Sequence, residues 1–149
     1  MPRLSVVMPV HNALPYLDEA IRSIIGQTFA DFEFVILNDG STDGSDAVLR
    51  SWAERDPRIR LIESTERLGP AGSSNRVVQE SRASLIARMD ADDISHPERL
   101  ERQIAIFDQV PDAVLSGCPH DTVDAEGRLV RKADLSRLVR RSPFAPFGH

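Results

Sequence analysis

The stretch Leu85-Ile86-Ala87-Arg88-Met89-Asp90-Ala91-Asp92-Asp93 decides how the rest of the sequence is interpreted. Its first part is apolar and typical of a short, mostly buried strand, whereas its last four residues include three carboxylates. Ionised carboxylates are very costly in an apolar interior, so these acids are expected where the strand leaves the core and meets solvent. Negative charges this close together repel one another and favour the binding of a divalent cation.

The acidic end of this stretch therefore predicts a metal site. Mg²⁺ and Mn²⁺ prefer oxygen ligands, and Mg²⁺ is commonly held by one or two carboxylates together with the oxygens of a bound phosphate. We hypothesise that residues 90–93 hold a cation and that the cation holds a diphosphate. A solvated acidic turn that caps the next helix is the alternative interpretation, and these nine residues alone leave both open.

The composition predicts one globular domain. The chain has 149 residues, enough for a single core, and is 41% hydrophobic and 28% charged. Its net charge of −5 argues against a general nucleic-acid-binding surface. The same charge would repel a phosphorylated substrate unless a metal ion or a local arginine offset it, which strengthens the case for a cation at residues 90–93.

Neither disulfide chemistry nor membrane insertion is indicated. Cys118 is the only cysteine, which excludes an internal disulfide and a thiolate metal cluster. No apolar run approaches the ~18 residues that a membrane-spanning helix needs. The start, Met1-Pro2-Arg3, leads directly into a predicted strand and lacks the layout of a signal peptide. We expect no transmembrane segment and a cytoplasmic location.

Strands and helices alternate along most of the chain. Strands are predicted at residues 4–10, 32–37, 58–63, 85–89 and 113–116, the first ending at Pro9 because proline cannot donate to a sheet ladder. Helices are predicted at residues 14–27, after Ser45, at 69–82 and after Ser95. A hairpin turn is predicted at residues 124–127, between strands 122–123 and 129–130. The alternation implies an α/β fold, with a mainly parallel sheet and helices on both faces.

In such sheets ligands bind beyond the carboxyl ends of the strands. Three polar segments follow predicted strands and should meet at that edge: residues 9–12, 38–45 and 90–93. One acidic turn can be accidental, but three polar segments on one edge predict a binding site.

Four motifs occur in a characteristic order. They are Val6-Val7-Met8-Pro9-Val10-His11-Asn12, then Phe34-Val35-Ile36-Leu37-Asn38-Asp39-Gly40-Ser41-Thr42-Asp43, then Leu68-Gly69-Pro70-Ala71-Gly72 with Asn75-Arg76, and finally Ile86-Ala87-Arg88-Met89-Asp90-Ala91-Asp92-Asp93. This ordered set resembles the inverting glycosyltransferases of family 2 over about residues 4–110. The resemblance implies the GT-A fold, a Rossmann-like fold of nucleotide-diphospho-sugar transferases.

The resemblance also implies roles for residues that bind the nucleoside. Pro9, Val10 and His11 would contact the uridine or other nucleoside, and Glu19 would support this pocket. Asp39 would accept a hydrogen bond from the base.

At the acidic end, Asp92 would be the principal ligand of Mn²⁺ or Mg²⁺, which bridges the two phosphates of the donor. Asp90 would bond the ribose or assist the metal, with Ala91 beside it in the nucleotide site. The favoured donor is a UDP-sugar.

The sequence departs from the family at one helix opening. Relatives often have Asn before Leu-Gly and Ala-Arg-Asn further on, where this chain has Arg67 and Ser73-Ser74-Asn75. A basic contact to the phosphates could come from Arg67 or Arg76 instead.

The chain is also short for the family, whose members carry a second half that binds the acceptor and supplies the catalytic base. Residues 1–149 are therefore expected to be a single nucleotide-sugar-binding domain, with the base beyond His149; Asp121, Asp124 and Asp134 are candidates by residue type only. The acceptor would be an unknown sugar or lipid-linked molecule in cell-wall, capsule or other surface polysaccharide synthesis. Self-association as a homodimer would cover apolar surface that the missing half normally covers.

Several alternatives stay open. Arg137, Arg140 and Arg141 suit either a solvated helix face or a contact with the inner face of the membrane. The chain could also be a nucleotide-sugar-binding module without turnover, or a nucleotidyltransferase, although no glycine-rich loop bearing a basic residue supports the latter. A P-loop is excluded because no G-x-x-x-x-G-K-[ST] occurs.

Overall fold

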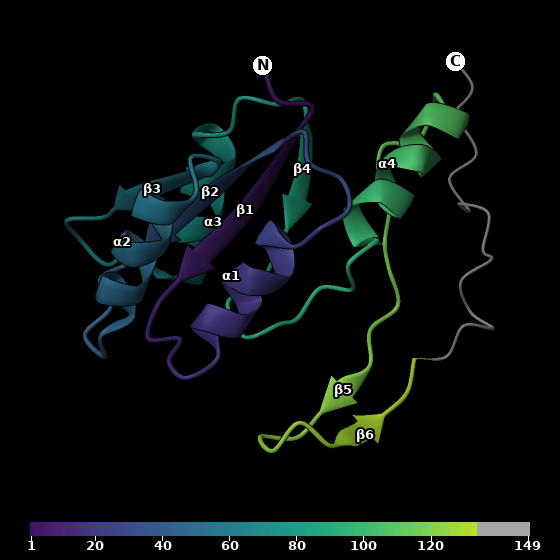
Figure 1. The fold of residues 1–149 in the computed structure, drawn as a ribbon. Helices are drawn as coiled ribbons and strands as arrows, with labels where there is room; N and C mark the ends of the chain where they lie inside the picture. The colour runs from purple at the N-terminus through teal and green to yellow at the C-terminus, as the bar shows by residue number, and fades with distance from the viewer. Residues whose placement is uncertain (134–149) are drawn as a thin grey trace, which may run out of the picture. The chain divides into compact units, whose positions relative to one another are not determined.

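The computed structural model describes residues 1–133, which fall into two compact units divided between Ala105 and Ile106 (Figure 1). The candidate base Asp134 and the three arginines considered for a membrane contact, Arg137, Arg140 and Arg141, lie outside the described residues.

The first unit is built on a parallel sheet of four strands, as predicted. They are β1 (Leu4–Val10), β2 (Phe32–Asn38), β3 (Ile59–Glu63) and β4 (Leu85–Arg88), in the order β3-β2-β1-β4. Every neighbouring pair is parallel, so the carboxyl ends of all four strands lie at one edge. β2 is buried along its whole length, because helices cover both of its faces.

Four helices connect or follow the strands: α1 (Leu17–Ile25), α2 (Ser45–Arg55), α3 (Gly69–Gln79) and α4 (Arg99–Gln109). On one face, apolar side chains of α1, α2 and the first turns of α4 pack on β1 and β2. On the other face, Val77 of α3 packs on Val7, Val35 and Leu37. Figure 1 shows α1 in front of β1 and α3 behind it. The predicted arrangement of helices on both faces is confirmed.

β1 has the predicted bounds, Leu4–Val10, and Pro9 lies next to its last residue. β1 continues to Val10, and Pro9 still pairs with Leu37 of β2. The carbonyl of Val7 accepts a hydrogen bond from Met89, so Val7 and Pro9, two residues on, direct their backbone groups to the same side. β4 ends at Arg88, and the missing N–H of Pro9 therefore interrupts no ladder.

The predicted strand at residues 113–116 is wrong. No strand forms there, and Val114 and Leu115 are 95% and 85% exposed. An apolar run becomes a strand when it pairs with another strand and buries one face. Within residues 1–133 this run joins neither sheet, and its two largest side chains face solvent. The predicted hairpin is confirmed: β5 (Thr122–Val123) pairs antiparallel with β6 (Leu129–Arg131) around the turn at Asp124 and Gly127.

No helix in the described part of the chain is long and apolar enough to span a membrane.

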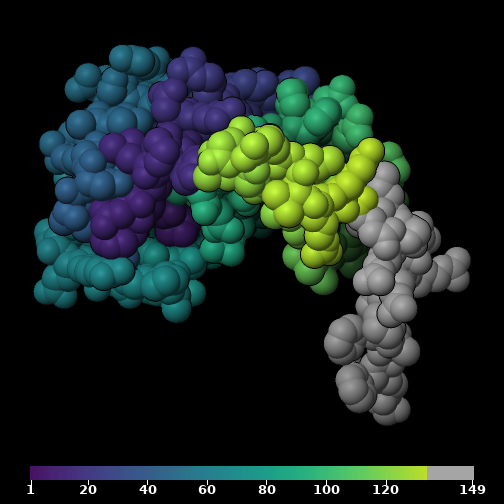
Figure 2. Space-filling model, turned by 90° about the horizontal axis from the view of Figure 1, so that it is seen from below, coloured from purple at the N-terminus to yellow at the C-terminus, as the bar shows by residue number. Residues whose placement is uncertain are grey.

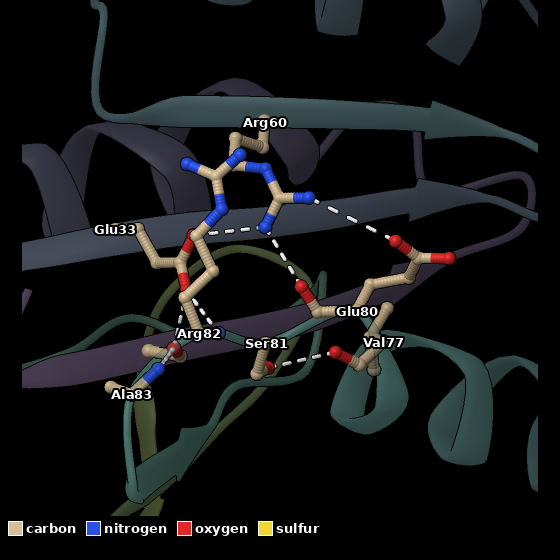
Figure 3. Close-up of polar contacts among 8 residues, drawn as sticks. Glu33, Arg60, Val77, Glu80, Ser81, Arg82 and Ala83 are labelled. Carbon is tan, nitrogen blue, oxygen red and sulfur yellow. Dashed lines mark hydrogen bonds and ion pairs between the residues drawn. The ribbon is translucent and has the colours of Figure 1, made fainter. Parts of the chain in front are cut away.

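A buried ionic network lies near the amino ends of the strands (Figure 3). Glu33 of β2 accepts hydrogen bonds from the Ser5 hydroxyl and the Arg82 backbone N–H, both at 2.6 Å, and from Arg60 Nη1 at 2.9 Å. Burial opposes ionisation of Glu33, but these hydrogen bonds outweigh it and lower the pKa of its carboxyl.

The same network fixes the carboxyl end of α3. Arg60 donates to the backbone carbonyl of Glu80 at 2.8 Å, directly after the helix. Since the other end of α3 lies at the opposite edge of the sheet, the network also orients the turn that lines the cavity described below.

Candidate functional site

A cavity of about 440 Å³ opens at the carboxyl edge of the sheet in the first unit. β1 and β4 point downward in Figure 1, so the view from below in Figure 2 shows the side of the molecule at which their carboxyl ends lie. On that side, atoms from the start of the chain (purple) lie between later segments drawn in blue and teal. The lining comes from the loop after β1, the end of β2, the start of α3 and the end of β4. Eight of the nine predicted site residues line it: Pro9, Val10, His11, Asp39, Arg67, Asp90, Ala91 and Asp92.

The ninth, Glu19, is not brought to the cavity. It lies exposed on α1 and is absent from the lining. Arg76 is likewise remote, because it is ion-paired with Glu80 one turn further along α3, at 2.8 Å. Of the two arginines proposed for the phosphates, only Arg67 therefore lines the cavity.

The loop after β1 is hydrogen-bonded to the loop after β2. Three successive backbone N–H groups of the first loop donate to side chains of the second: Asn12 to Ser41 Oγ, Ala13 to Ser45 Oγ and Leu14 to Asp43 Oδ2. In return the Asn12 side chain accepts from the backbone N–H of Thr42 at 2.8 Å. The cavity wall formed by residues 9–14 is thus fixed by residues 38–45.

Asp43, which takes part in these hydrogen bonds between the two loops, is a turn residue. Its other oxygen accepts from the Ser45 backbone N–H at 3.0 Å, and its hydrogen bonds with Ser45 are the main reason why the pKa of its carboxyl is lowered. Gly44, at φ +97°, occupies the N-cap position of α2 in a conformation that side chains disfavour.

His11 braces the wall from within. Its Nδ1 lies 2.8 Å from the backbone carbonyl oxygen of Asp39. A carbonyl only accepts, so Nδ1 carries the proton in this contact. In the neutral ring Nε2 is then an acceptor, 3.4 Å from the side-chain nitrogen of Asn12. Both nitrogens are therefore engaged in holding the loops.

Asp39 caps the helix that borders the cavity. Its two carboxylate oxygens accept from the backbone N–H groups of Leu68, at 2.6 Å, and Gly69, at 2.9 Å. α3 begins at Gly69 and has no side-chain cap of its own, so the buried Asp39 carboxylate takes that place. Each oxygen keeps a second lone pair, with which it could accept the predicted bond from a nucleobase.

The acids after β4 differ in their surroundings. Asp90 Oδ1 lies 2.7 Å from Arg88 Nη2, and both side chains line the cavity. Asp92 is exposed and also lines it, whereas Asp93 does not.

Among the described residues no three histidine, cysteine or acidic side chains form a ready metal cage. A pair of carboxylates fits a cation whose remaining ligands come from phosphate oxygens and water. Such a donor set agrees with a site that is complete only when a diphosphate is bound.

The acidic loop is held from behind by residues that the sequence reasoning missed. Arg99, the first residue of α4, donates to the backbone carbonyl of Arg88 at 2.7 Å and to Ser95 Oγ at 2.9 Å. The buried Gln27 side chain donates to the carbonyl of His96 and accepts from the N–H of Leu100. The local sequence does not indicate these roles of Arg99 and Gln27. Their side chains form hydrogen bonds with groups that lie far away in the chain or in the preceding turn.

The sequence matches one family model, described as glycosyl transferase family 2, over residues 5–144. Among curated relatives, an uncharacterized glycosyltransferase of Haemophilus influenzae is 29% identical over 139 residues, which are 93% of this chain and 55% of the relative. The putative glycosyltransferase EpsE of Bacillus subtilis is 35% identical over 109 residues, 72% of this chain and 39% of its own length. A putative teichuronic acid biosynthesis glycosyltransferase, TuaG, of Bacillus subtilis is 30% identical over 69% of this chain and 41% of TuaG. The chain thus spans about half or less of the length of these relatives.

Two solved structures are similar in fold. Residues 1–349 of S. aureus TarS in complex with UDP-GlcNAc match with a TM-score of 0.69 and 21% identity, over 80% of this chain and 37% of that one. The mannosyltransferase PcManGT of Pyrobaculum calidifontis in complex with GDP-Man and Mn²⁺ matches with a TM-score of 0.64 and 28% identity, over 83% of this chain and 36% of that one. The predicted fold class is confirmed by these matches.

Proposed function

This chain belongs to glycosyl transferase family 2, and on that premise we propose that its cavity binds a nucleotide-diphosphate sugar through Mn²⁺ or Mg²⁺ held by Asp92 and Asp90. The observation that carries the proposal is the meeting of Asp39, from β2, with Asp90 and Asp92, from the end of β4, in one cavity. Asp39 is about fifty residues from Asp90 and Asp92 in the sequence, and a nucleotide in this cavity could present its base to Asp39 and its diphosphate to the other two acids.

The nucleoside is assigned to the end formed by the loop after β1. Pro9 and Val10 offer backbone and apolar surface, His11 holds the loop, and Asp39 accepts from a base N–H. Two solved structures of similar fold contain UDP-GlcNAc and GDP-Man, nucleotide sugars with different bases. We favour a UDP-sugar for this chain, and the binding experiment below compares the two bases.

The diphosphate is assigned to the acidic end. Asp92 is exposed, lines the cavity and offers both oxygens to a cation. When bound, such a cation supplies Lewis-acid stabilisation of the negative charge that develops on the departing nucleoside diphosphate. Arg67, on the loop before α3, adds a positive charge to the same cavity.

For the whole protein we propose transfer of the sugar to a hydroxyl of an unknown sugar or lipid-linked acceptor in surface polysaccharide synthesis. The names of relatives, TuaG among them, support this class of pathway. Residues 1–149 would form the donor-binding domain, and the base that deprotonates the acceptor is expected outside them. Homodimer formation, a cytoplasmic location and contact with the inner membrane face also stay predictions.

Calorimetry with UDP and with GDP, each with and without Mn²⁺, tests the site. We expect Mn²⁺-dependent binding of one nucleotide that Asp92→Ala abolishes. Glu54→Ala removes an exposed acid from α2, remote from the cavity, and should leave binding unchanged. Equal affinity with and without the metal would contradict the assignment of Asp92.

A second experiment tests whether the catalytic base lies outside residues 1–149. Incubation with a radiolabelled nucleotide sugar and Mn²⁺ should give tight binding and little transfer to an added acceptor from these 149 residues alone. Rapid transfer would show that the base lies within the chain, contrary to the proposal.

A further inference from the structure

We propose that Arg88 is a further ligand of the donor's diphosphate, and that it competes with the divalent cation for Asp90 until the diphosphate arrives. This inference rests on the donor site proposed above. It adds to Arg67 a second guanidinium for the diphosphate, and it gives Arg88 a competition for Asp90 that Arg67 does not share.

The position of Arg88 brings its side chain to the reacting end of the cavity. It is the last residue of β4, two residues before Asp90, and side chains two apart in an extended segment lie on the same face. Its guanidinium Nη2 is 2.7 Å from Asp90 Oδ1, and its side chain lines the cavity together with Asp90 and Asp92.

The backbone of Arg88 is fixed while its side chain is free to change partners. The Arg88 carbonyl accepts from Arg99 at 2.7 Å, and the next residue, Met89, donates to the Val7 carbonyl at 3.0 Å. The side chain itself is 61% exposed, and that of Asp90 is 48% exposed. An ion pair this exposed is worth little, so the guanidinium can leave Asp90 at small cost when a stronger partner is present.

A second arginine matters in this cavity because the amino end of α3 has two of its N–H groups already engaged. The amino end of α3 would ordinarily attract a phosphate, but its first N–H groups donate to the Asp39 carboxylate. Among the described lining residues the permanent cations are Arg67 and Arg88. A diphosphate placed beside Asp90 and Asp92 therefore meets carboxylates first, and planar guanidinium groups are well suited to pair with its oxygens.

The cation and the Arg88 guanidinium compete for the Asp90 carboxylate. In the free protein Arg88 holds one carboxylate oxygen that a cation would otherwise coordinate. In the donor complex Asp90 would give that oxygen to the cation, and Arg88 would turn to the phosphate. Arg88 therefore weakens cation binding before the donor arrives and strengthens donor binding afterwards.

Removal of Arg88 should consequently change two affinities in opposite directions. With the whole 149-residue chain, electron paramagnetic resonance of free Mn²⁺ measures binding of the metal alone, and calorimetry measures UDP binding at saturating Mn²⁺. Arg88→Ala should tighten Mn²⁺ binding about two- to fivefold, by removing an exposed ion pair. It should weaken UDP binding about tenfold or more, by removing a charge-assisted hydrogen bond.

Arg67→Ala is the matched control, since Arg67 lines the same cavity but is not paired with Asp90. It should weaken UDP binding without tightening Mn²⁺ binding. Arg88→Gln keeps the length of the side chain and should reproduce the effects of Arg88→Ala, so a folding defect in one variant does not decide the result.

An unchanged UDP affinity in both Arg88 variants would overturn the inference, as would a parallel loss of Mn²⁺ and UDP binding, which indicates a purely structural pair. Absence of Mn²⁺ and UDP binding in the unaltered chain would instead overturn the donor site itself. The two failures are therefore distinguishable.

Discussion

The two edges of the parallel sheet carry similar charged residues in opposite circumstances. At the amino edge Glu33 is only 6% exposed and both its oxygens are hydrogen-bonded. At the carboxyl edge Asp92 is exposed and lines an open cavity. One acid is satisfied by its own protein, whereas the other has coordination sites left for a ligand.

This difference separates a structural role from a binding role better than residue type does. A buried carboxylate is tolerated only when hydrogen bonds and an opposite charge compensate its desolvation. An exposed carboxylate needs no such compensation and keeps its lone pairs for a cation. Substitutions at the two edges should therefore affect different properties, stability at the amino edge and ligand binding at the carboxyl edge.

The largest expected effect on stability comes from Glu33→Ala. It leaves the partly buried Arg60 without its closest carboxylate and the Ser5 hydroxyl and Arg82 N–H without their acceptor. Removing one member of such a network costs about 3 kcal/mol of unfolding free energy. Urea unfolding followed by circular dichroism measures it through the shift of the midpoint.

Glu63→Ala is the matched control for that variant. Glu63 also pairs with an arginine, Arg50, at 2.7 Å, but the pair is exposed. Its loss should cost less than about 1 kcal/mol. Equal losses in the two variants would show that burial does not distinguish the amino edge in the way argued here.

A smaller effect is expected from acid. The pKa of Glu33 is lowered by folding, so its contribution to stability is complete above its ordinary value of 4.5 and is lost as the pH falls through the folded-state value. Glu33→Gln cannot titrate, so its stability should fall less steeply than that of the unaltered chain below about pH 4.5. Urea midpoints measured between pH 6 and pH 3 check this; parallel curves would contradict the assigned role of Glu33.

The carboxyl edge was predictable from the sequence for a physical reason. In a parallel α/β sheet the loops after successive strands must meet at one edge, so the order of strands alone places residues 9–12, 38–45 and 90–93 together. The turn-forming residues of those loops and the acids after β4 are local signals. The meeting of Asp39, Asp90 and Asp92 at one cavity could be predicted in this way, whereas their roles stay predictions.

The amino edge and the supports of the site could not be predicted in the same way. Glu33 stands in a strand that is otherwise apolar, and nothing nearby indicates that Arg60 and the Arg82 backbone N–H will satisfy it. Glu19 was assigned by resemblance, yet its helix presents it to solvent. The apolar run at residues 113–116 fits a strand by composition, but strand formation depends on a pairing partner that local sequence does not specify.

The smallest expected effect on stability is that of Asp92→Asn, and it is the sharpest test of the contrast. Asp92 is exposed and close in sequence to two other acids, so its charge contributes no pairing energy and some repulsion. The substitution should change the free energy of unfolding by no more than about 0.5 kcal/mol, measured by the same urea titration. It should nevertheless remove Mn²⁺-dependent nucleotide binding, because an amide oxygen is a weaker ligand for a divalent cation than a carboxylate. A large loss of stability would mean that Asp92 holds its own loop together, as Glu33 holds the amino edge, and the distinction between the two edges would then fail where the proposed function depends on it.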